Sequence, residues 1–420
     1  MRFRSYTNKR GTIIKCFMNG TLLLLMLAGC GTVSELETET ETGSSDVNAA
    51  AEQQIVEKED ADIEQLKGRC QEIALTCQGL FFDAETEEAD NFSNSTLLTQ
   101  AAVDSIEDKL ANAGYPIMNS DSKYPSYLEN AEGLSEFWNF VNHDENAQQE
   151  IITVSSYGRL YYYIFQYING EKKYISATIS WNENDELVID EITKQSVLDW
   201  GITNEGDFYY QIIELDRHWD AYNLIRLKPV DHTLYDLNAE YIIPIGYINK
   251  NLFLVNWSDT DFSNLCFNDL FEYLYKKKTG DYFYPEGFEF HEDAYWISAD
   301  LFEDTILSYF NISLNEFRAK TLYDDESETY PWQEVNVDNV SYFPTLTPEV
   351  TECRENEDGT FTLVVNVMCL DMKADPLFTH EVTIRTDGNK DFQYIANEIT
   401  YTGDYELPDS KPRMSVQWER

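Results

Sequence analysis

The dipeptide Asn169-Gly170, set between two runs of strand-forming residues, constrains the fold more than any other feature of the sequence. The runs are 161–168 and 173–179, and both are rich in aromatic and β-branched residues. Both positions of a two-residue hairpin turn need positive φ, which Asn and Gly adopt most readily. A polar turn after Trp181 leads into a third run. The sequence therefore predicts an antiparallel meander from about residue 150.

Other segments carry weaker signals of the same kinds. Further strands are predicted at 208–213, 241–243, 360–368, 381–385 and 392–399, the third following an Asp358-Gly359 turn. Apolar residues spaced by three and four from Ile63 to Leu80 mark one face of a helix. Two further helices are predicted from Ser95 to Gly114 and from 267 to 278, the second ending before Gly280. Another runs from Leu301 to Phe310 with Ser298 as its cap, and a last one follows a Ser313–Glu316 capping box.

This order of elements predicts an α+β fold with N-terminal helices, an antiparallel β-meander with interspersed helices, and a small β-rich C-terminal unit. Strands and helices do not alternate regularly, which disfavours a mostly parallel sheet of the kind found in transporter solute-binding proteins. The expected divisions are a leader at 1–29, a disordered acidic tether at 30–60, a main domain at 61–330, a β-rich domain at 331–407 and a tail at 408–420. The acidic run 324–328 marks the boundary between the two domains.

The N-terminus carries five basic residues, then a short leucine-rich run that ends in Leu27-Ala28-Gly29-Cys30. These four residues resemble the lipobox of bacterial lipoproteins. The resemblance implies cleavage between Gly29 and Cys30, a lipid of palmitate-like acyl chains on Cys30, and a position at the outer face of the cell membrane of a Gram-positive bacterium. The alternative is an uncleaved anchor, but the run is shorter than the roughly 20 apolar residues that span a bilayer.

Charge narrows the choice of partners. The formal net charge is -46, and without residues 1–29, which hold five of the 30 basic residues and none of the 76 acidic ones, it becomes −51. Nucleic acid is excluded as a partner because its phosphates would repel such a chain. An anionic membrane surface repels the body in the same way, which leaves lipid on Cys30 as the membrane contact. Cationic ligands would be attracted, although a solubilising surface explains the same acidity.

Five cysteines remain once the leader and Cys30 are set aside: Cys70, Cys77, Cys266, Cys353 and Cys369. An odd number cannot all pair, and no C-x-x-C motif is present. Cys70 and Cys77 lie seven apart on one predicted helix, which separates their Cα atoms by roughly 10 Å, too far for a disulfide. Buried small thiols are the expected state of most of these residues.

Three short motifs are similar in order to those of penicillin-binding proteins and β-lactamases. They are Ser120 with Lys123, Ser180 with Asn182, and the run Lys278-Thr279-Gly280. Their context argues against acyl transfer, because Ser120 does not begin a predicted helix and Lys278 ends one. A calcium loop starting at Asp259 lacks the glycine and glutamate that the motif requires, and the histidines are scattered. The sequence predicts no metal, no cofactor and no catalytic residue.

Aromatic residues offer a possible binding surface. Trp181, Trp219, Trp257 and Trp296 are candidates for a sugar-stacking platform. The same residue types are good strand and core residues, and that interpretation is preferred because aromatics usually fill the core before a site.

Several segments together resemble an uncharacterised lipoprotein family of Firmicutes, especially gut clostridia. They are 113–117 with 127–130, 301–303 with 309–313 and 317–318, and 392–397. That family implies no activity. We therefore expect a lipid-anchored, non-catalytic binding or interaction module for an extracellular glycan, peptide or protein. The alternative is an extracellular hydrolase acting on glycan or cell-wall material, since scattered carboxylates leave no linear motif.

Overall fold

The computed structural model describes residues 45–88, 96–212, 222–285, 295–334, 345–386, 391–407 and 412–413, with backbone only for 45–61. The chain divides into two compact units, Met1–Asp62 and Ile63–Arg420. Helix α1 (Ser45–Phe82) begins in the first unit, so residues 45–60 of the expected disordered tether are helical instead. The alanines and glutamines at 49–54 are strong helix formers, which explains the difference. Residues 30–44 lie outside the described chain.

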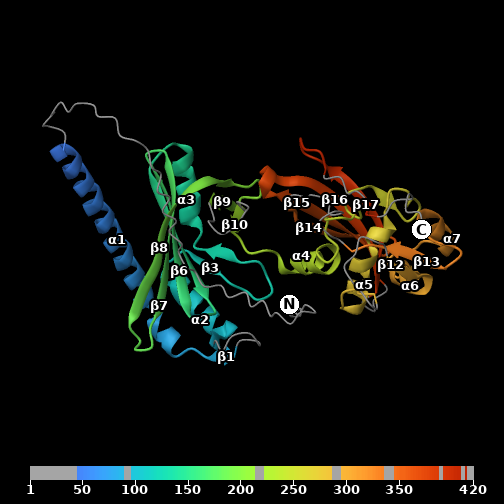
Figure 1. Ribbon diagram of the computed structural model, residues 1–420, viewed down its shortest axis with the longest axis horizontal. Helices are drawn as coiled ribbons and strands as arrows, with labels where there is room; N and C mark the ends of the chain where they lie inside the picture. Colours follow the sequence, from blue (N-terminus) through green and yellow to red (C-terminus); the bar gives the residue numbers. More distant parts are fainter. Residues whose placement is uncertain are drawn as a thin grey trace, which may run out of the picture. The chain divides into compact units, whose positions relative to one another are not determined.

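The second unit begins with a curved antiparallel sheet (Figure 1). Its strands are β3 (Ile117–Asn119), β4 (Tyr127–Glu129), β5 (Ala147–Ser155), β6 (Arg159–Ile168), β7 (Glu171–Trp181), β8 (Leu187–Ile202), β9 (Phe208–Ile212) and β10 (Tyr222–Ile225). They follow the order β10-β9-β8-β7-β6-β5-β3-β4, and β3 with β5 is a parallel pair. Asn169 and Gly170 have φ of 52° and 83°, which confirms the predicted β6–β7 hairpin.

The two outer strands of this sheet meet. Arg226, directly after β10, bridges to Tyr127 of β4, and the Leu128 amide donates to the Arg226 carbonyl at 2.8 Å. The described sheet is therefore closed by one backbone contact, which places Arg226 where both edges converge.

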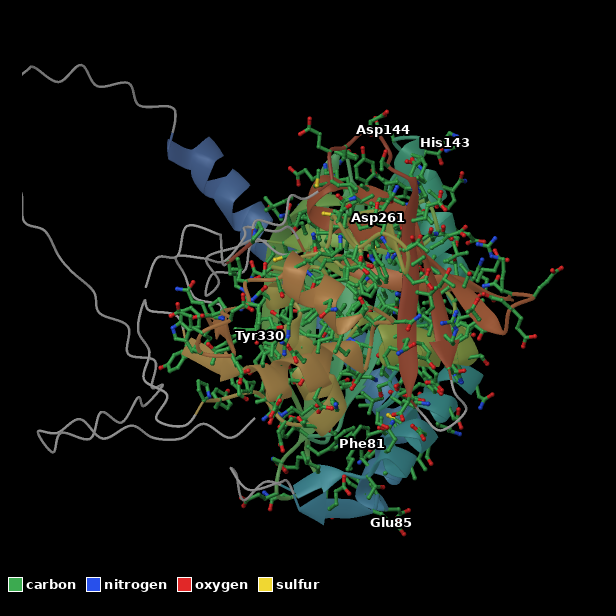
Figure 2. All side chains as sticks on the ribbon, turned by 90° about the vertical axis from the view of Figure 1, so that its right-hand side faces the viewer. Phe81, Glu85, His143, Asp144, Asp261 and Tyr330 are labelled. Carbon is green, nitrogen blue, oxygen red and sulfur yellow. The ribbon has the colours of Figure 1, made fainter. Side chains whose placement is uncertain are left out.

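Each face of the sheet buries its own cluster. One face packs against α1 and α2 (Gln100–Asn112), with Cys70, Ile73 and Ile106 fully buried. The predicted apolar face of α1 is confirmed there. The opposite face packs against α3 (Glu132–Asn142) through Leu134 and Phe137, and Figure 1 shows α1 and α3 on opposite sides of the sheet. His143 and Asp144 follow at the end of α3 (Figure 2), where Asp144 accepts a hydrogen bond from Tyr167.

A second sheet forms the C-terminal part of the same unit, in the order β11-β17-β16-β15-β14. Its strands are β11 (Trp257–Ser258), β14 (Thr347–Glu355), β15 (Thr360–Cys369), β16 (Ala374–Thr386) and β17 (Phe392–Tyr401). The helices of this part are α4 (His232–Leu237), a π-helix (Asn238–Ile242), α5 (Phe271–Thr279), α6 (Ala299–Leu307) and α7 (Leu314–Lys320). Two small two-stranded antiparallel sheets pair β1 (Thr86–Glu88) with β2 (Thr96–Leu98), and β12 (Tyr295–Ser298) with β13 (Thr329–Trp332). Short 3-10 turns at Phe267–Asp269 and Leu370–Met372 complete the elements.

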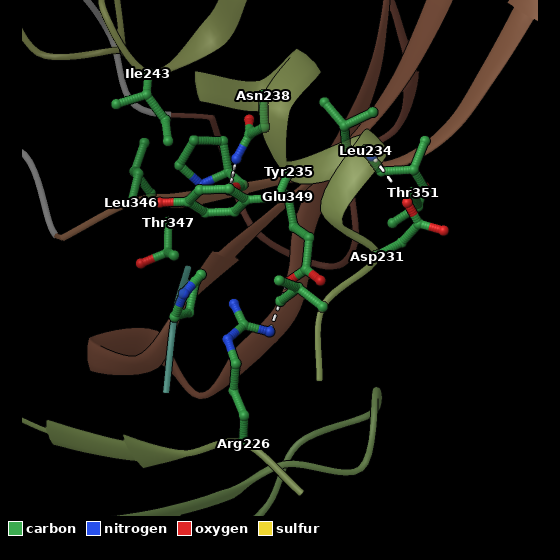
Figure 3. A pocket seen from close by; sticks show the side chains of 14 residues that line it. Arg226, Asp231, Leu234, Tyr235, Asn238, Ile243, Leu346, Thr347, Glu349 and Thr351 are labelled. Atoms are coloured by element: carbon green, nitrogen blue, oxygen red, sulfur yellow. Dashed lines mark hydrogen bonds and ion pairs between the residues drawn. The ribbon is translucent and has the colours of Figure 1, made fainter. Parts of the chain in front are cut away.

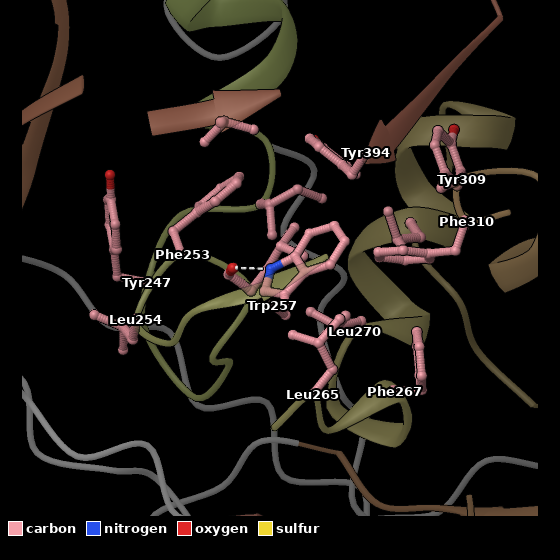
Figure 4. Packing of buried hydrophobic residues seen from close by; sticks show 14 of the residues in the cluster. Tyr247, Phe253, Leu254, Trp257, Leu265, Phe267, Leu270, Tyr309, Phe310 and Tyr394 are labelled. Carbon is pink, nitrogen blue, oxygen red and sulfur yellow. Dashed lines mark hydrogen bonds between the residues drawn. The ribbon is translucent and has the colours of Figure 1, made fainter. Parts of the chain in front are cut away.

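One aromatic core joins this sheet to the helices before it (Figure 4). Trp257 packs against Phe262 and Phe310, and its indole nitrogen donates to the Leu252 carbonyl at 2.8 Å. The cluster runs from Ile242 to Tyr394. The expected domain boundary between 330 and 331 therefore falls inside a single core, and the α+β class with a β-rich C-terminal region is confirmed.

Three details correct the sequence-based expectations. Residues 241–243 belong to a π-helix and the turn after it rather than a strand. Asp231 caps α4, and the π-helix continues directly from α4 and buries Ile242. Helix α2 begins at Gln100 instead of after Ser95, since Thr99 accepts from the Ala102 amide. Ser298 precedes α6 without a side-chain cap bond. Ser313, by contrast, caps α7 as predicted.

Gly280 ends α5 at φ 82°, as its position after three lysines predicts. Within the described residues, no helix combines the length and the apolar character needed to cross a bilayer.

Candidate functional site

Two adjoining cavities, of about 440 and 250 Å³, lie beside β14 and the segment that follows β10. Both are lined by Arg226, Asp231, Thr347, Glu349 and Thr351. We call the two together the β14 hollow, and Figure 3 shows the larger cavity. It is built from segments far apart in the sequence, which is the usual construction of a binding site on a rigid framework.

Arg226 lies at the centre of the β14 hollow. Its guanidinium is 2.9 Å from the carboxylate of Glu349 and 3.5 Å from that of Asp207. The side chain is 15% exposed, so it is partly desolvated but still open to the cavity. Figure 3 shows it directed from the lower wall toward Glu349.

Carboxylates outnumber cations in the smaller cavity. Its wall holds Glu205, Asp207, Asp231, Glu349 and Asp375 against Arg226 and Lys228. Asp231 is engaged at the N-terminus of α4, where it accepts from the Thr233 and Leu234 amides. Among the described residues, Glu205 and Asp375 have no ion pair. The hollow therefore keeps a surplus of negative charge.

The surplus of negative charge affects the pKa of Asp207. Burial raises its pKa, and the charges of Glu349 and Asp375 act in the same direction, whereas the hydrogen bond from the Leu227 amide opposes them. That amide donates at 2.9 Å. A buried carboxylate held by a backbone donor and an arginine is a fixed part of the wall.

The larger cavity has an apolar side. Leu234, Tyr235, Ile243, Leu346 and Pro348 line it, and Tyr235 lies in the centre of the view in Figure 3. An apolar wall beside a few polar groups is typical of ligand cavities.

The loop before β4 secures α4 in the wall. Lys123 pairs with Asp236 at 2.7 Å, and the ring of Tyr124 stacks on that of His232 with centroids 3.7 Å apart. These exposed contacts fix Pro125, the loop's own contribution to the lining. Lys123 therefore has a structural partner in place of the acyl-transfer role that the S-x-x-K pattern raised.

The outer edge of β14 borders the hollow. Asn238, 3% exposed, donates from Nδ2 to the Pro348 carbonyl at 2.9 Å. The pairing of β14 with β15 shifts between Val350 and Glu352, which leaves Thr351 in a β-bulge that lines both cavities. Bulges commonly redirect side chains next to sites.

The three predicted tryptophans that the structure describes are not brought together. Trp181 packs on Phe81 against the first sheet, Trp257 is buried in the aromatic core, and Trp296 is 43% exposed on β12. Trp219 lies outside the described residues, as do Gly29 and Cys30. The described members do not form one stacking platform.

The serines and lysines of the acyl-transfer pattern are also separate. Ser120 donates to the carboxylate of Glu107, whose pKa burial raises to about 7. Lys278 pairs with Asp304 in the C-terminal part. Asp261, labelled in Figure 2, accepts from the Ser263 amide at 2.9 Å. No group of three potential metal ligands occurs among the described residues.

Arg413, near the C-terminus, is buried between Asp269, Glu272 and Gln333. We call these three residues the Arg413 slot. The Arg413 guanidinium lies 3.3 Å from Asp269 and 3.0 Å from Glu272, and donates to the Gln333 carbonyl at 2.7 Å. The side chain is 1% exposed. Burial lowers the pKa of nearby Lys250 to about 7, and its ammonium lies 3.4 Å from the ring centroid of Tyr273.

A second sealed network contains His380. Its Nε2 lies 2.9 Å from the Tyr247 hydroxyl and its Nδ1 is 2.7 Å from the Asn397 side-chain oxygen. Asn397 in turn donates to the Val255 carbonyl, so His380 is neutral with its proton on Nδ1. Burial lowers the pKa of His380 to about 4.

The five cysteines beyond the leader and Cys30 are all free thiols. Cys70, Cys77 and Cys369 are buried, Cys266 is half-buried and Cys353 is exposed on β14. Burial raises the pKa of the Cys266 thiol to about 12. None of these thiols is activated.

The sequence analysis did not select the residues of the β14 hollow. Arg226 and its partners Asp207 and Glu349 lie on segments that only the fold brings together. The one local signal is the stretch 226–231, where a basic residue, a proline and a helix-capping Asp231 follow a strand.

A family model described as a family of unknown function, DUF6070, matches residues 63–413. The chain belongs to this DUF6070 family. The matched range begins where the second compact unit begins and ends at Arg413, the residue that fills the slot. No curated protein and no solved structure matches the chain.

Proposed function

We propose that this DUF6070 protein is a lipid-anchored extracytoplasmic binding protein that holds its ligand in the β14 hollow and carries out no catalysis. The proposal has two independent parts. The anchor rests on Leu27-Ala28-Gly29-Cys30 behind a basic, apolar leader. The binding role rests on the hollow.

The anchor is tested by intact-mass analysis of the protein from membranes. Acyl mass on a chain that starts at Cys30 is the expected result. The Cys30→Ala variant should stay unlipidated and leave the membrane fraction. A membrane-bound, lipid-modified Cys30→Ala chain of unchanged size would contradict this part.

The observation that carries the binding role is the combination of walls in the β14 hollow. Apolar side chains face one cavity, and carboxylates without ion pairs among the described residues face the other. Hydrophobic area supplies affinity and a few fixed polar groups supply orientation. The acidic surplus favours ligands that carry positive charge, and distinguishes the hollow from a general solubilising surface.

The binding role is tested by filling the hollow. Thr351→Trp places a large side chain at an exposed position that lines both cavities. Thr193→Trp, at an exposed position of β8, is the matched control. We expect retention on peptides or glycan fragments to fall at least tenfold in Thr351→Trp and to persist in Thr193→Trp. Equal retention by both variants would place the ligand elsewhere.

A glycan or cell-wall hydrolase is the second candidate, because Asp207 combines a raised pKa with a second carboxylate, Glu349, in the same hollow. Glycoside hydrolysis uses a pair of carboxyl groups, of which the general acid has a raised pKa. The Leu227 amide and Arg226 already engage Asp207, which supports a structural role. Product release that disappears in Asp207→Asn, while ligand retention persists, would favour the hydrolase over the binding protein.

A further inference from the structure

We propose that the β14 hollow receives an extended peptide bearing lysine or arginine side chains, which adds as a strand along the outer edge of β14. This inference rests on the proposed binding function and names its ligand class. The edge, the charge and the apolar wall each support it separately.

The edge argument starts from the sheet order, in which β14 is the terminal strand of the described sheet. Residues 346–351 all line the larger cavity, so the hollow follows the strand lengthwise. A terminal strand presents N–H and C=O groups that a partner strand can pair with.

The contact at Pro348 shows which way these groups face. Its carbonyl accepts from the side chain of Asn238, so it is directed away from β15 and toward the hollow. Backbone groups of alternate residues in a strand face the same edge, which places those of Val350 on this side too. Pro348 has no N–H to donate and its carbonyl already accepts from Asn238, so the backbone hydrogen bonds of an added strand would come from Val350.

The charge argument concerns the base of the hollow. Glu205 and Asp375 lack ion pairs among the described residues, and Arg226 is shared between Asp207 and Glu349. A peptide cation placed there completes pairs that the described chain leaves open. A glutamate or aspartate side chain would meet five carboxylates instead.

The apolar argument concerns the spacing of the walls. Side chains of an extended peptide alternate between two faces. One face would lie against Leu234, Ile243 and Leu346, and the other would approach Glu205 and Asp375. The hollow therefore fits a sequence in which basic and apolar residues alternate.

The test uses the full-length chain in detergent and four probes in calorimetric titration. The first is a capped hexapeptide of alternating lysine and valine. The second has glutamate in place of lysine, the third is the lysine peptide N-methylated at every residue, and the fourth is spermine. N-methylation removes the backbone donors that strand addition needs, and spermine carries charge without any peptide backbone.

The lysine peptide should bind at least tenfold more tightly than each of the other three. Its affinity should fall severalfold in Glu205→Gln, at an exposed position in the turn before β9, and further when Asp375→Asn is added. Glu183→Gln, in the exposed turn before β8, is the matched control and should leave the affinity unchanged.

Two outcomes overturn the inference and leave the binding function standing. One is binding of spermine or of the N-methylated peptide as tight as that of the lysine peptide. The other is a glycan fragment that binds in a Thr351-dependent way while none of the peptides does. If Thr351→Trp alters the binding of no ligand at all, the proposed function fails as well.

Discussion

Arg226 and Arg413 each lie between two carboxylates, in surroundings that differ in almost every other respect. Arg413 is 1% exposed, and its guanidinium also binds the Asp269 and Gln333 carbonyls. Arg226 is 15% exposed, faces a cavity, and has acids around it that lack ion pairs among the described residues. The same ionic chemistry therefore closes the C-terminal core in one place and leaves capacity for a ligand in the other.

The largest effect expected from this comparison is on stability, in Arg413→Met. Removing the guanidinium leaves Asp269 and Glu272 without their buried counter-charge, which costs about 3–5 kcal/mol of unfolding free energy. Urea unfolding of the full chain measures it. Arg354→Met, in an exposed pair with Glu381, is the control and should change stability by less than about 1 kcal/mol. A loss that small in Arg413→Met would show that the slot does not hold the core together.

Thiol labelling gives an independent view of the same slot. The Cys266 thiol lies 3.3 Å from the Asp269 carboxylate, beside Arg413, whereas Cys353 is exposed on β14. In the unmodified chain, Cys353 should react with a maleimide well before Cys266. Arg413→Met should accelerate the labelling of Cys266 and leave Cys353 unchanged, which mass spectrometry of peptides can follow.

The next effect is a loss of stability in acid. The pKa of His380 is about 4 in the folded chain and 6.5 ordinarily, so folding favours the neutral ring. Its contribution is complete above pH 6.5 and is lost as the pH falls toward 4, to a total of about 3 kcal/mol. Glu107, whose burial raises its pKa to about 7, acts oppositely, because its contribution is lost as the pH rises through 7.

Urea unfolding in a Glu107→Gln background separates the two groups, since it removes the opposing contribution. The imidazole resonance of His380, followed by NMR, should titrate near pH 4. Titration of that resonance near 6.5 would mean that the ring reaches water, and that the core is less sealed than its contacts with Tyr247 and Asn397 indicate.

The smallest effect on stability belongs to Arg226→Met. Arg226 and Asp207 are each 15% exposed, whereas Glu349 is 45% exposed. Asp207 keeps the hydrogen bond from the Leu227 amide, so the expected loss is about 1–2 kcal/mol, below that of Arg413→Met. A loss as large as that of Arg413→Met, in the same urea experiment, would erase the distinction between the two arginines. Such a loss would indicate that Arg226 serves the stability of the fold instead of ligand binding.

The sequence predicted the fold where local chemistry decides it. Asn169-Gly170 specified a hairpin because few residues adopt its turn, and Gly280 ended a helix for the same reason. Residues 241–243 were wrongly assigned because their β-branched composition outweighed the distant helix cap at Asp231. Local propensity cannot register a helix that begins ten residues earlier.

The candidate site was beyond this kind of reasoning. Trp257 was one candidate for a binding surface, although a core role was preferred, and its contacts with Phe262 and Phe310 place it in the core. Nothing in the sequence distinguishes Arg226 from a surface arginine, because its partner Glu349 is brought beside it only by the fold. Seventy-six acidic residues give no indication of which few share a cavity, because that depends on strand order and register.

The single bridge between Tyr127 and Arg226 gives the first sheet an unusual mechanical property. The Arg226 carbonyl holds the Leu128 amide, while its side chain is part of the hollow's wall. We expect a bound ligand that displaces Arg226 to weaken the hydrogen bond between the Arg226 carbonyl and the Leu128 amide. The hydrogen-exchange rate of one amide, that of Leu128, becomes a gauge of whether the hollow is occupied.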